Sequence, residues 1–272
     1  MTRKIKLIIE YEGTRYHGWQ VQPNGVTIQE ILQECLQKIT KKKTSVVGSG
    51  RTDSGVHAEG QVAHFVTESE MTCHQFLMAL NSLLPPDIVV KQVEEVPRDF
   101  HAQKSAVRKI YRFTILNRDY PSALAHHRCW FIQFPLDLRA MRRAKTYLEG
   151  RHDFSAFRAA NCEAKNPVRE LNKIDISRKG DFIHLHFDGN GFLKYMVRNL
   201  VGTLVQVGKR KIPPARVKEI LESRDRKNAG PTARAQGLFL VEVFYDNKKR
   251  GIAAGQKGLK KGKISRVKKG RA

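Results

Sequence analysis

The sequence predicts an α+β fold built from two α/β units. Short apolar strands alternate with amphipathic helices along the whole chain, a mixture that is unlike a helical bundle. A new set of strands begins near residue 104, and 272 residues with 40% hydrophobic content are enough to bury a core. We therefore expect an N-terminal unit over 1–103, a C-terminal unit over 104–246 and a basic segment over 247–272.

In the N-terminal unit, helices are indicated by their caps and strands by apolar runs. Thr27 and Glu30 form a capping box that opens a helix, and the run Lys41–Lys43 ends it with the charge that a helix C-terminus favours. Pro85 and Pro86 stop a second helix. The expected elements are a strand at 5–11, a helix from 27, strands at 46–47 and 61–66, a helix at 73–84 and a strand at 88–96.

The C-terminal unit continues in the same style. Asp137 is a candidate cap for a helix that carries apolar residues as far as Leu148. The other expected elements are strands at 105–115, 168–177 and 182–187, helices at 193–207 and 213–223, and a strand at 238–245. That last strand is almost continuously apolar, so we expect it to be buried on both faces.

The charge of the chain predicts an anionic partner. The formal net charge is +24, and a charge this large points to RNA, DNA or an anionic surface. Residues 247–272 contain eleven Lys and Arg with no acid and no aromatic residue. We expect this segment to be disordered when free and to act as an arm on nucleic-acid phosphates. The alternative is a tail that only improves solubility.

Several other classes of protein are disfavoured. No run of about 18 apolar residues predicts a membrane span, and the N-terminus lacks the core of a signal peptide, so we expect a cytoplasmic protein. The four cysteines are scattered without a Cys-x-x-Cys pair, and the histidine clusters at 126–127 and 184–186 lack a full ligand set, so we expect no metal. Ser54 and His57 lack the Gly-x-Ser-x-Gly context of a serine hydrolase.

Asp53 is the first candidate for chemistry. It lies in a loop that holds Gly48, Gly50 and Gly55 and no long hydrophobic side chain. Such a loop allows a close approach to the backbone, which suits an acid that acts on a nucleic acid. The alternative is an aspartate that only bonds its own turn, so the functional interpretation needs partners elsewhere in the chain.

Tyr111 and Arg198 are the candidate partners. Tyr111 points to the opposite side of its strand from Ile110 and Arg112, and it offers a ring for stacking a base and a hydroxyl for handling a proton. Arg198 lies four residues after Lys194 on a mostly apolar helix, where a buried arginine needs a carboxylate such as Asp53. The alternatives are an ordinary strand tyrosine and an arginine that reaches solvent by its long stem.

Five blocks of sequence resemble the tRNA pseudouridine synthase A family, and they occur in the family's order. One such block would be weak, whereas five in order over roughly residues 3–246 are highly specific. The blocks are Gly50–Ala58 (GRTDSGVHA), Tyr11–Gln20 (YEGTRYHGWQ), Lys109–Phe113 (KIYRF), Phe192–Thr203 (FLKYMVRNLVGT) and Thr232–Leu238 (TARAQGL).

The resemblance implies a fold and an activity. The fold is two α/β units whose mainly antiparallel sheets join into one continuous sheet, with helices packed on one side and a catalytic cleft between the units. The activity is the isomerisation of uridine to pseudouridine in the anticodon stem-loop of tRNA, at positions 38, 39 and 40. The resemblance also implies a homodimer that uses neither a metal nor an organic cofactor.

The resemblance assigns roles residue by residue. Asp53 matches the catalytic aspartate, and Arg198 matches the arginine that pairs with it. Tyr111 matches the tyrosine that stacks on the target base, Arg51 the arginine that fills the space left by the flipped base, and Leu238 an apolar wall of the site. The chain departs from the family in Ser54, where alanine is common, and in the basic segment after Tyr245.

Two other functions remain open from the residues alone. A non-catalytic, basic RNA-binding protein fits the charge and the aromatic residues equally well, but binding alone gains nothing from a carboxylate near phosphates. A nucleic-acid hydrolase lacks its expected metal ligands or nucleophile.

Overall fold

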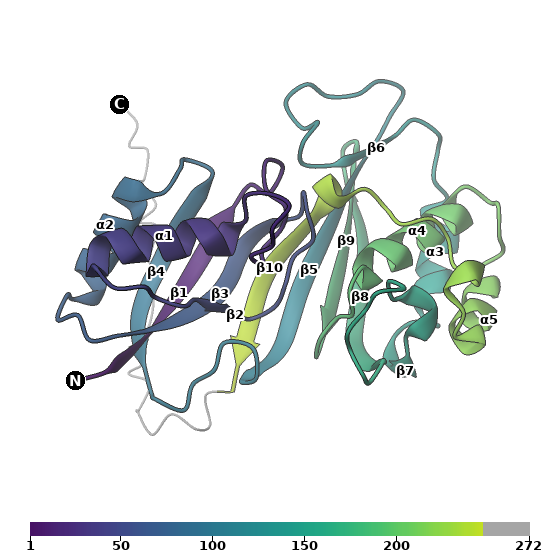
Figure 1. The fold of residues 1–272 in the computed structure, drawn as a ribbon. Coiled ribbons are helices and arrows are strands. Elements are labelled where there is room, and N and C mark those ends of the chain that lie inside the picture. The colour runs from purple at the N-terminus through teal and green to yellow at the C-terminus, as the bar shows by residue number, and fades with distance from the viewer. Residues whose placement is uncertain (247–272) are drawn as a thin grey trace, which may run out of the picture.

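Within residues 1–246, a single mixed sheet of ten strands forms the centre of the fold, and five α-helices accompany it (Figure 1). The computed structural model describes residues 1–246, so the predicted phosphate-binding arm at 247–272 lies outside the described residues. The path through the sheet is β4-β1-β3-β10-β5-β9-β8-β7, with β2 paired to β3 and β6 paired to β5. Most pairings are antiparallel, which confirms the predicted α+β class and the continuous sheet.

The N-terminal half contributes strands that flank β1 on both sides. Its elements are β1 Arg3–Tyr11, α1 Ile28–Thr40, β2 Val47–Gly48, β3 His57–Thr67, α2 Cys73–Leu83 and β4 Ile88–Val96. Strand β1 pairs antiparallel with β3 and with β4. Alternate residues of β1, namely Ile5, Leu7 and Ile9, are fully buried. The predicted capping box of Thr27 and Glu30 is present at the start of α1.

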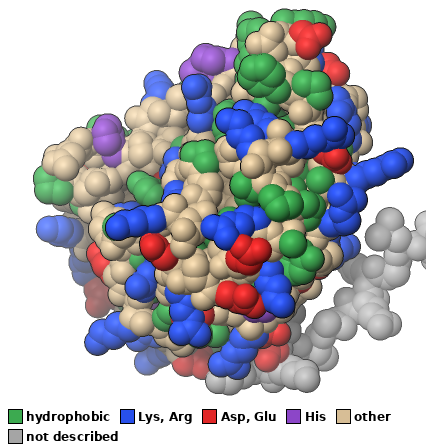
Figure 2. Space-filling view, turned by 90° about the vertical axis from the view of Figure 1, so that its right-hand side faces the viewer, with side chains coloured by type: hydrophobic (Ala, Val, Ile, Leu, Met, Phe, Trp, Pro, Cys, Tyr) green, Lys and Arg blue, Asp and Glu red, His purple; other side chains and the backbone are tan. Residues whose placement is uncertain are grey.

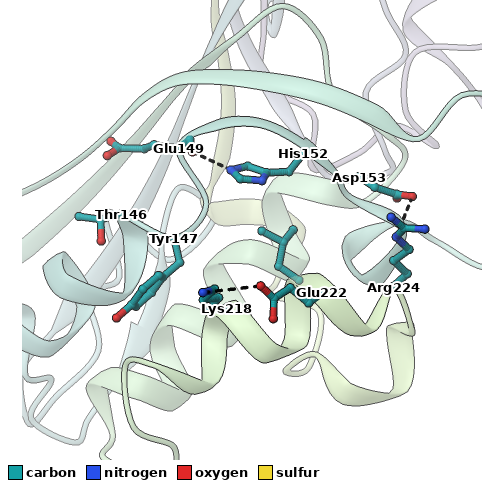
Figure 3. A pocket seen from close by; sticks show the side chains of 9 residues that line it. Thr146, Tyr147, Glu149, His152, Asp153, Lys218, Glu222 and Arg224 are labelled. Carbon is teal, nitrogen blue, oxygen red and sulfur yellow. Dashed lines mark hydrogen bonds and ion pairs between the residues drawn. The ribbon is translucent and has the colours of Figure 1, made fainter.

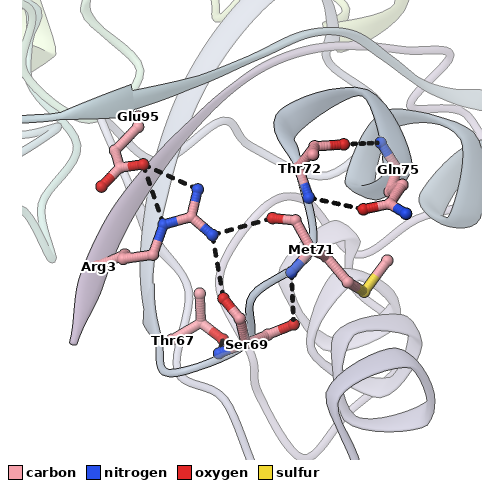
Figure 4. A network of polar contacts seen from close by, with 7 residues as sticks. All are labelled: Arg3, Thr67, Ser69, Met71, Thr72, Gln75 and Glu95. Carbon is pink, nitrogen blue, oxygen red and sulfur yellow. Dashed lines mark hydrogen bonds and ion pairs between the residues drawn. The ribbon is translucent and has the colours of Figure 1, made fainter. Parts of the chain in front are cut away.

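Arg3 joins three segments at the edge of this half (Figure 4). Its guanidinium bonds the carboxylate of Glu95 at 2.8 and 2.9 Å and the carbonyls of Ser69 and Met71 at 3.0 and 2.9 Å. Directly after Met71, Thr72 and Gln75 form a second capping box at the start of α2. The first strand therefore fixes the position of the second helix.

The C-terminal half has two short strands that the sequence did not predict, β6 and β7. Three and four residues are too few to show an alternation of apolar and polar side chains. The elements of this half are β5 Ala106–Asn117, β6 Trp130–Ile132, α3 Leu138–Lys145, β7 Gly150–Asp153, β8 Val168–Lys179, β9 Phe182–Gly189, α4 Met196–Gly208, α5 Arg216–Ser223 and β10 Leu238–Tyr245, with 3-10 turns η1 Ser155–Phe157, η2 Arg226–Asn228 and η3 Ala235–Gly237. Asp137 caps α3 as predicted.

Strand β10 connects the two halves. It runs parallel to β3 and antiparallel to β5, so a strand from the end of the described chain lies between the strands of the N-terminal and C-terminal halves (Figure 1). The prediction that it is buried on both faces is wrong. Leu238, Leu240 and Val243 are buried, but Glu242 is exposed and Val241 is half-buried, because only one face of the strand packs on the core.

Helices α4 and α5 begin three residues later than predicted. Tyr195 has a φ of 63°, in the left-handed region, so an α-helix cannot run through it and α4 begins at Met196. Before α5, the amides of Arg216 and Val217 bond the carbonyls of Pro213 and Pro214. These three-residue spacings belong to a 3-10 turn, which precedes the helix.

Candidate active site

The loop that carries Asp53 connects β2 to β3 and is fixed by the segment after β1. The carbonyl of Thr52 accepts a hydrogen bond from the amide of Trp19 at 3.1 Å, and the hydroxyl of Thr52 lies 2.8 Å from that of Tyr11. Gly55 has a φ of 74°, which allows the sharp turn back into β3. The main-chain carbonyl of Asp53 closes this turn by accepting the amide of Val56, which leaves the carboxylate free for another partner.

That partner is Arg198, which lies in the first turn of α4. Its Nη1 donates to Oδ2 of Asp53 at 3.1 Å, and the two side chains are 14% and 19% exposed. The Nε of Arg198 donates to the carbonyl of Ala233 at 2.8 Å, and the guanidinium lies 4.8 Å from the ring of Tyr195. The alternatives of an aspartate that only forms a turn and an arginine that extends into solvent are both wrong.

Burial and positive charge act in opposite directions on Asp53. Burial raises the pKa of the carboxyl, and the charges of Arg198 and Lys194 lower it, with burial the largest of these effects. Lys194 was predicted to share a helix face with Arg198, but it precedes the helix because of the turn at Tyr195. The site therefore holds a carboxylate that needs its cations in order to stay ionised.

Tyr111 lies in β5, close enough to Asp53 for the charge of the carboxylate to affect the pKa of the Tyr111 hydroxyl. Its ring is 7% exposed and meets the ring of Phe192 edge-on, with 5.0 Å between the ring centres. Burial raises the pKa of the hydroxyl, and nearby Tyr11 and Asp53 raise it further, so the phenol is neutral.

Arg51 and Leu238 lie at different depths. Arg51 is 62% exposed, and its Nη1 bonds Oε2 of Glu163 at 2.8 Å rather than the carboxylate of Asp53. Leu238 is buried at the start of β10, opposite Phe113 of β5. The structure thus brings Asp53, Arg198 and Tyr111 together, with Arg51 at the surface and Leu238 in the core.

The sequence did not indicate the role of His57. Its Nδ1 accepts the amide of Gly13 at 3.0 Å, which leaves Nε2 as the donor to the carbonyl of Gln236 at 3.1 Å. The ring stacks on Phe239 with 4.6 Å between the centres, and burial lowers the pKa of the imidazole. His57 therefore holds the end of the Asp53 loop as a neutral side chain; its partners are distant in sequence and gave no signal.

A separate cavity of about 540 Å³ lies between α5 and the segment 146–153 (Figure 3). Glu149, His152, Asp153 and Glu222 are among its lining residues, and Asp153 faces Arg224 across an ion pair of 3.4 Å. None of the five predicted site residues lines it. Within residues 1–246, no group of three or more His, Cys, Asp or Glu is placed to hold a metal ion. No helix in the same range is long and apolar enough to cross a membrane.

The fold and the site define an enzyme that acts on RNA. A buried acid held by an arginine, beside a buried tyrosine in a strongly basic chain, favours an enzyme over a protein that only binds RNA. Comparison with known proteins agrees. The family model described as "tRNA pseudouridine synthase" matches residues 7–104 and 144–246.

Individual relatives cover almost the whole chain. The tRNA pseudouridine synthase A of Acetivibrio thermocellus is 47% identical over 89% of this chain and all of that protein. The corresponding protein of Myxococcus xanthus is 49% identical over 89% of this chain and 92% of its own length. The chain therefore belongs to the tRNA pseudouridine synthase family, whose members are isomerases. A solved Cbf5-Nop10-Gar1 complex is also similar, at 12% identity and a TM-score of 0.32 over 74% of this chain and 54% of that chain.

Proposed function

We propose that this protein converts uridine to pseudouridine in the anticodon stem-loop of tRNA, at positions 38, 39 and 40. The observation that carries the proposal is the buried contact of 3.1 Å between Asp53 and Arg198. Family membership supports the reaction, and the named activity of the relatives supports tRNA as the substrate. In this proposal the substrate binds in a cleft between the two units, with the helices packed on one side of the sheet.

The proposed chemistry begins with ionised Asp53. The bond between N1 of uracil and C1′ of the ribose breaks, the base turns over, and C5 forms a new bond to C1′. C5 then loses its proton, and N1 gains one, so the product is an isomer of the substrate. Asp53 either attacks covalently or removes a proton from C2′ to give a glycal. In both routes Arg198 keeps the carboxylate charged and aimed.

The target base must leave the stem before any of this chemistry takes place. Extrusion costs a few kcal/mol, and stacking against an aromatic side chain returns roughly 1–3 kcal/mol of that cost. Tyr111 is the proposed stacking platform and Leu238 the apolar wall. We propose that Arg51 releases the carboxylate of Glu163 and enters the space that the flipped base leaves. The exposed position of Arg51 allows this movement.

Binding is proposed to depend on the positive surface. Figure 2 shows Lys and Arg side chains spread over one face of the molecule, with Asp and Glu between them. Such charges supply affinity and register through phosphates rather than through bases. We also propose a homodimer located in the cytoplasm that works without a cofactor, as the resemblance to the family implies.

The test replaces the acid by its neutral isostere. Asp53→Asn should abolish tritium release from tRNA labelled at C5 of uridine and leave tRNA binding largely intact. Asp119→Asn is the matched control, because Asp119 is exposed in the loop after β5. An active Asp53→Asn protein would show that the acid is not the catalyst. Loss of activity in both variants would show that the loss is not specific to Asp53.

A further inference from the structure

Lys109 brings a positive charge close to the Asp53 loop. It lies two residues before Tyr111 in β5, so both side chains point to the same side of the sheet. Its Nζ donates to the carbonyl of Ser49 at 2.7 Å. A methyl group added at Gly50 would lie 2.6 Å from that Nζ, so the ammonium occupies the space that the glycine leaves.

Arg169 supplies a second cation beside Lys109. It lies at the start of β8, and its Nη1 bonds the carbonyls of Asn166 and Val168 at 2.8 and 2.7 Å. A methyl group added at Gly191 would lie 3.6 Å from its Nε. Lys109 is paired in register with Gly189 of β9, two residues before Gly191, so the side chains of both cations lie against glycines of the same segment.

Neither cation is neutralised within residues 1–246. Each hydrogen bond that these two side chains make goes to a main-chain carbonyl, and neither forms an ion pair with a described carboxylate. Burial and the charge of Arg169 lower the pKa of Lys109 to about 8, and burial lowers the pKa of Arg169. Two cations that repel each other in a partly buried place are stabilised by a bound anion.

Among residues 1–246, Arg169 is the one charged group that shifts the pKa of Lys109. Gly189 and Val243 face it from the two neighbouring strands in the sheet register, and neither carries charge. Tyr245 lies near Ser49, and burial raises the pKa of its hydroxyl, so it is neutral. Arg169 is therefore the charged group that acts on Lys109.

We propose that Lys109 and Arg169 together bind one phosphodiester of the RNA backbone next to the target uridine. This inference rests on the proposed function, because it takes tRNA as the ligand. Lys109 bonds the carbonyl of Ser49 at the start of the Asp53 loop and lies two residues before Tyr111, so a phosphate held there would position the nucleotide whose base Tyr111 receives. Both cations have further N–H donors directed to no described residue, which are available to phosphate oxygens.

Methylphosphonate substitution tests the proposal. Anticodon stem-loop RNAs are made with one neutral methylphosphonate at each position around the target uridine, and the Kd is measured with the full-length protein. At one position the substitution should weaken binding to the unaltered protein by about tenfold, as expected for a charge-assisted bond. The same substitution should have a clearly smaller effect on binding to Lys109→Met or Arg169→Gln, because each variant keeps only one of the two cations. An equal penalty at every position in all three proteins would overturn the inference.

The salt dependence of binding separates a phosphate contact from a structural role. Each variant should make the negative slope of log K against log salt less steep, by up to the roughly 0.7–0.9 that one phosphate contact contributes. Lys218→Met in α5 is the matched control, because its exposed ammonium lies on the far helix (Figure 1), and it should leave the methylphosphonate pattern unchanged. If Lys109 only holds the Ser49 carbonyl, its variant would lose turnover with an unchanged slope, and the inference would be wrong.

These measurements keep the inference distinct from the proposed function. Binding and its salt slope need no turnover, so they give a result even if the protein forms no pseudouridine. Tritium release by the unaltered protein, together with an unchanged pattern in both variants, would leave the function standing and remove the phosphate site.

Discussion

Replacing Arg198 by methionine should raise the pH below which the protein loses activity. The change removes the guanidinium that lies 3.1 Å from Oδ2 of Asp53 and keeps a side chain of similar length. Burial, which raises the pKa of Asp53, stays in place, while the largest opposing charge is lost. Because the reaction needs the ionised carboxylate, the pH below which activity falls should move upward.

The size of the effect follows from the burial of the pair. Removing one partner of a buried ion pair costs about 3–5 kcal/mol. Both side chains keep some exposure, 14% and 19%, so we expect the lower end of that range. If this cost of about 3 kcal/mol falls on the ionised carboxylate, the rate should be up to roughly 150-fold lower at pH values below the pKa of Asp53, and the deficit should be smaller at neutral pH.

The assay is the single-turnover rate of tritium release at saturating tRNA, measured between pH 5 and 9. The deficit of Arg198→Met should shrink as the pH rises, because hydroxide restores the carboxylate that the arginine kept ionised. Arg198→Lys is the control, since it retains the charge and loses the Nε bond to the carbonyl of Ala233. A deficit that is the same at every pH would refute this account and assign Arg198 a purely geometric role.

Three further outcomes follow from the structure. Because burial raises the pKa of Asp53 in the folded protein, stability falls as pH rises from the pKa of the unfolded state through that of the folded state; calorimetry of the unaltered protein should show this fall, and it should be absent in Asp53→Asn. Gly202→Ala should cost about 3 kcal/mol or more in urea unfolding, because its methyl group would lie 1.7 Å from the carbonyl oxygen of Pro231. The affinity for anticodon stem-loop RNA should fall as pH rises through about 8, where Lys109 loses its proton, and this fall should be absent in Lys109→Met.

Local physics was enough to predict the central contact of the site. A buried arginine needs a carboxylate, and Asp53 was available in a loop that did not otherwise use it. The capping box at Thr27 likewise placed the start of α1. These features depend on residues whose own chemistry demands a partner.

Other features depend on contacts that a sequence pattern does not carry. Nothing in the pattern marks Tyr195 as left-handed, because only glycine and asparagine commonly adopt that conformation. The bonds of His57 to Gly13 and Gln236 join segments that are far apart along the chain. The position of Lys109 could have been predicted from the sequence, since the strand alternation that sets Tyr111 apart from Ile110 and Arg112 places Lys109 on the same side as Tyr111.

The position of β10 has a consequence for the order in which this enzyme becomes active. The path through the sheet passes from β3 to β5 only by way of β10, so before residues 238–245 have been synthesised each half-sheet has an open edge. Domains fold during synthesis from the N-terminus onward. A nascent chain would therefore carry Asp53 and Arg198 on separate folding units while it is still attached to the ribosome. Contact between Asp53 and Arg198 would wait for β10, so RNA modification would begin only after residues 238–245 have been synthesised.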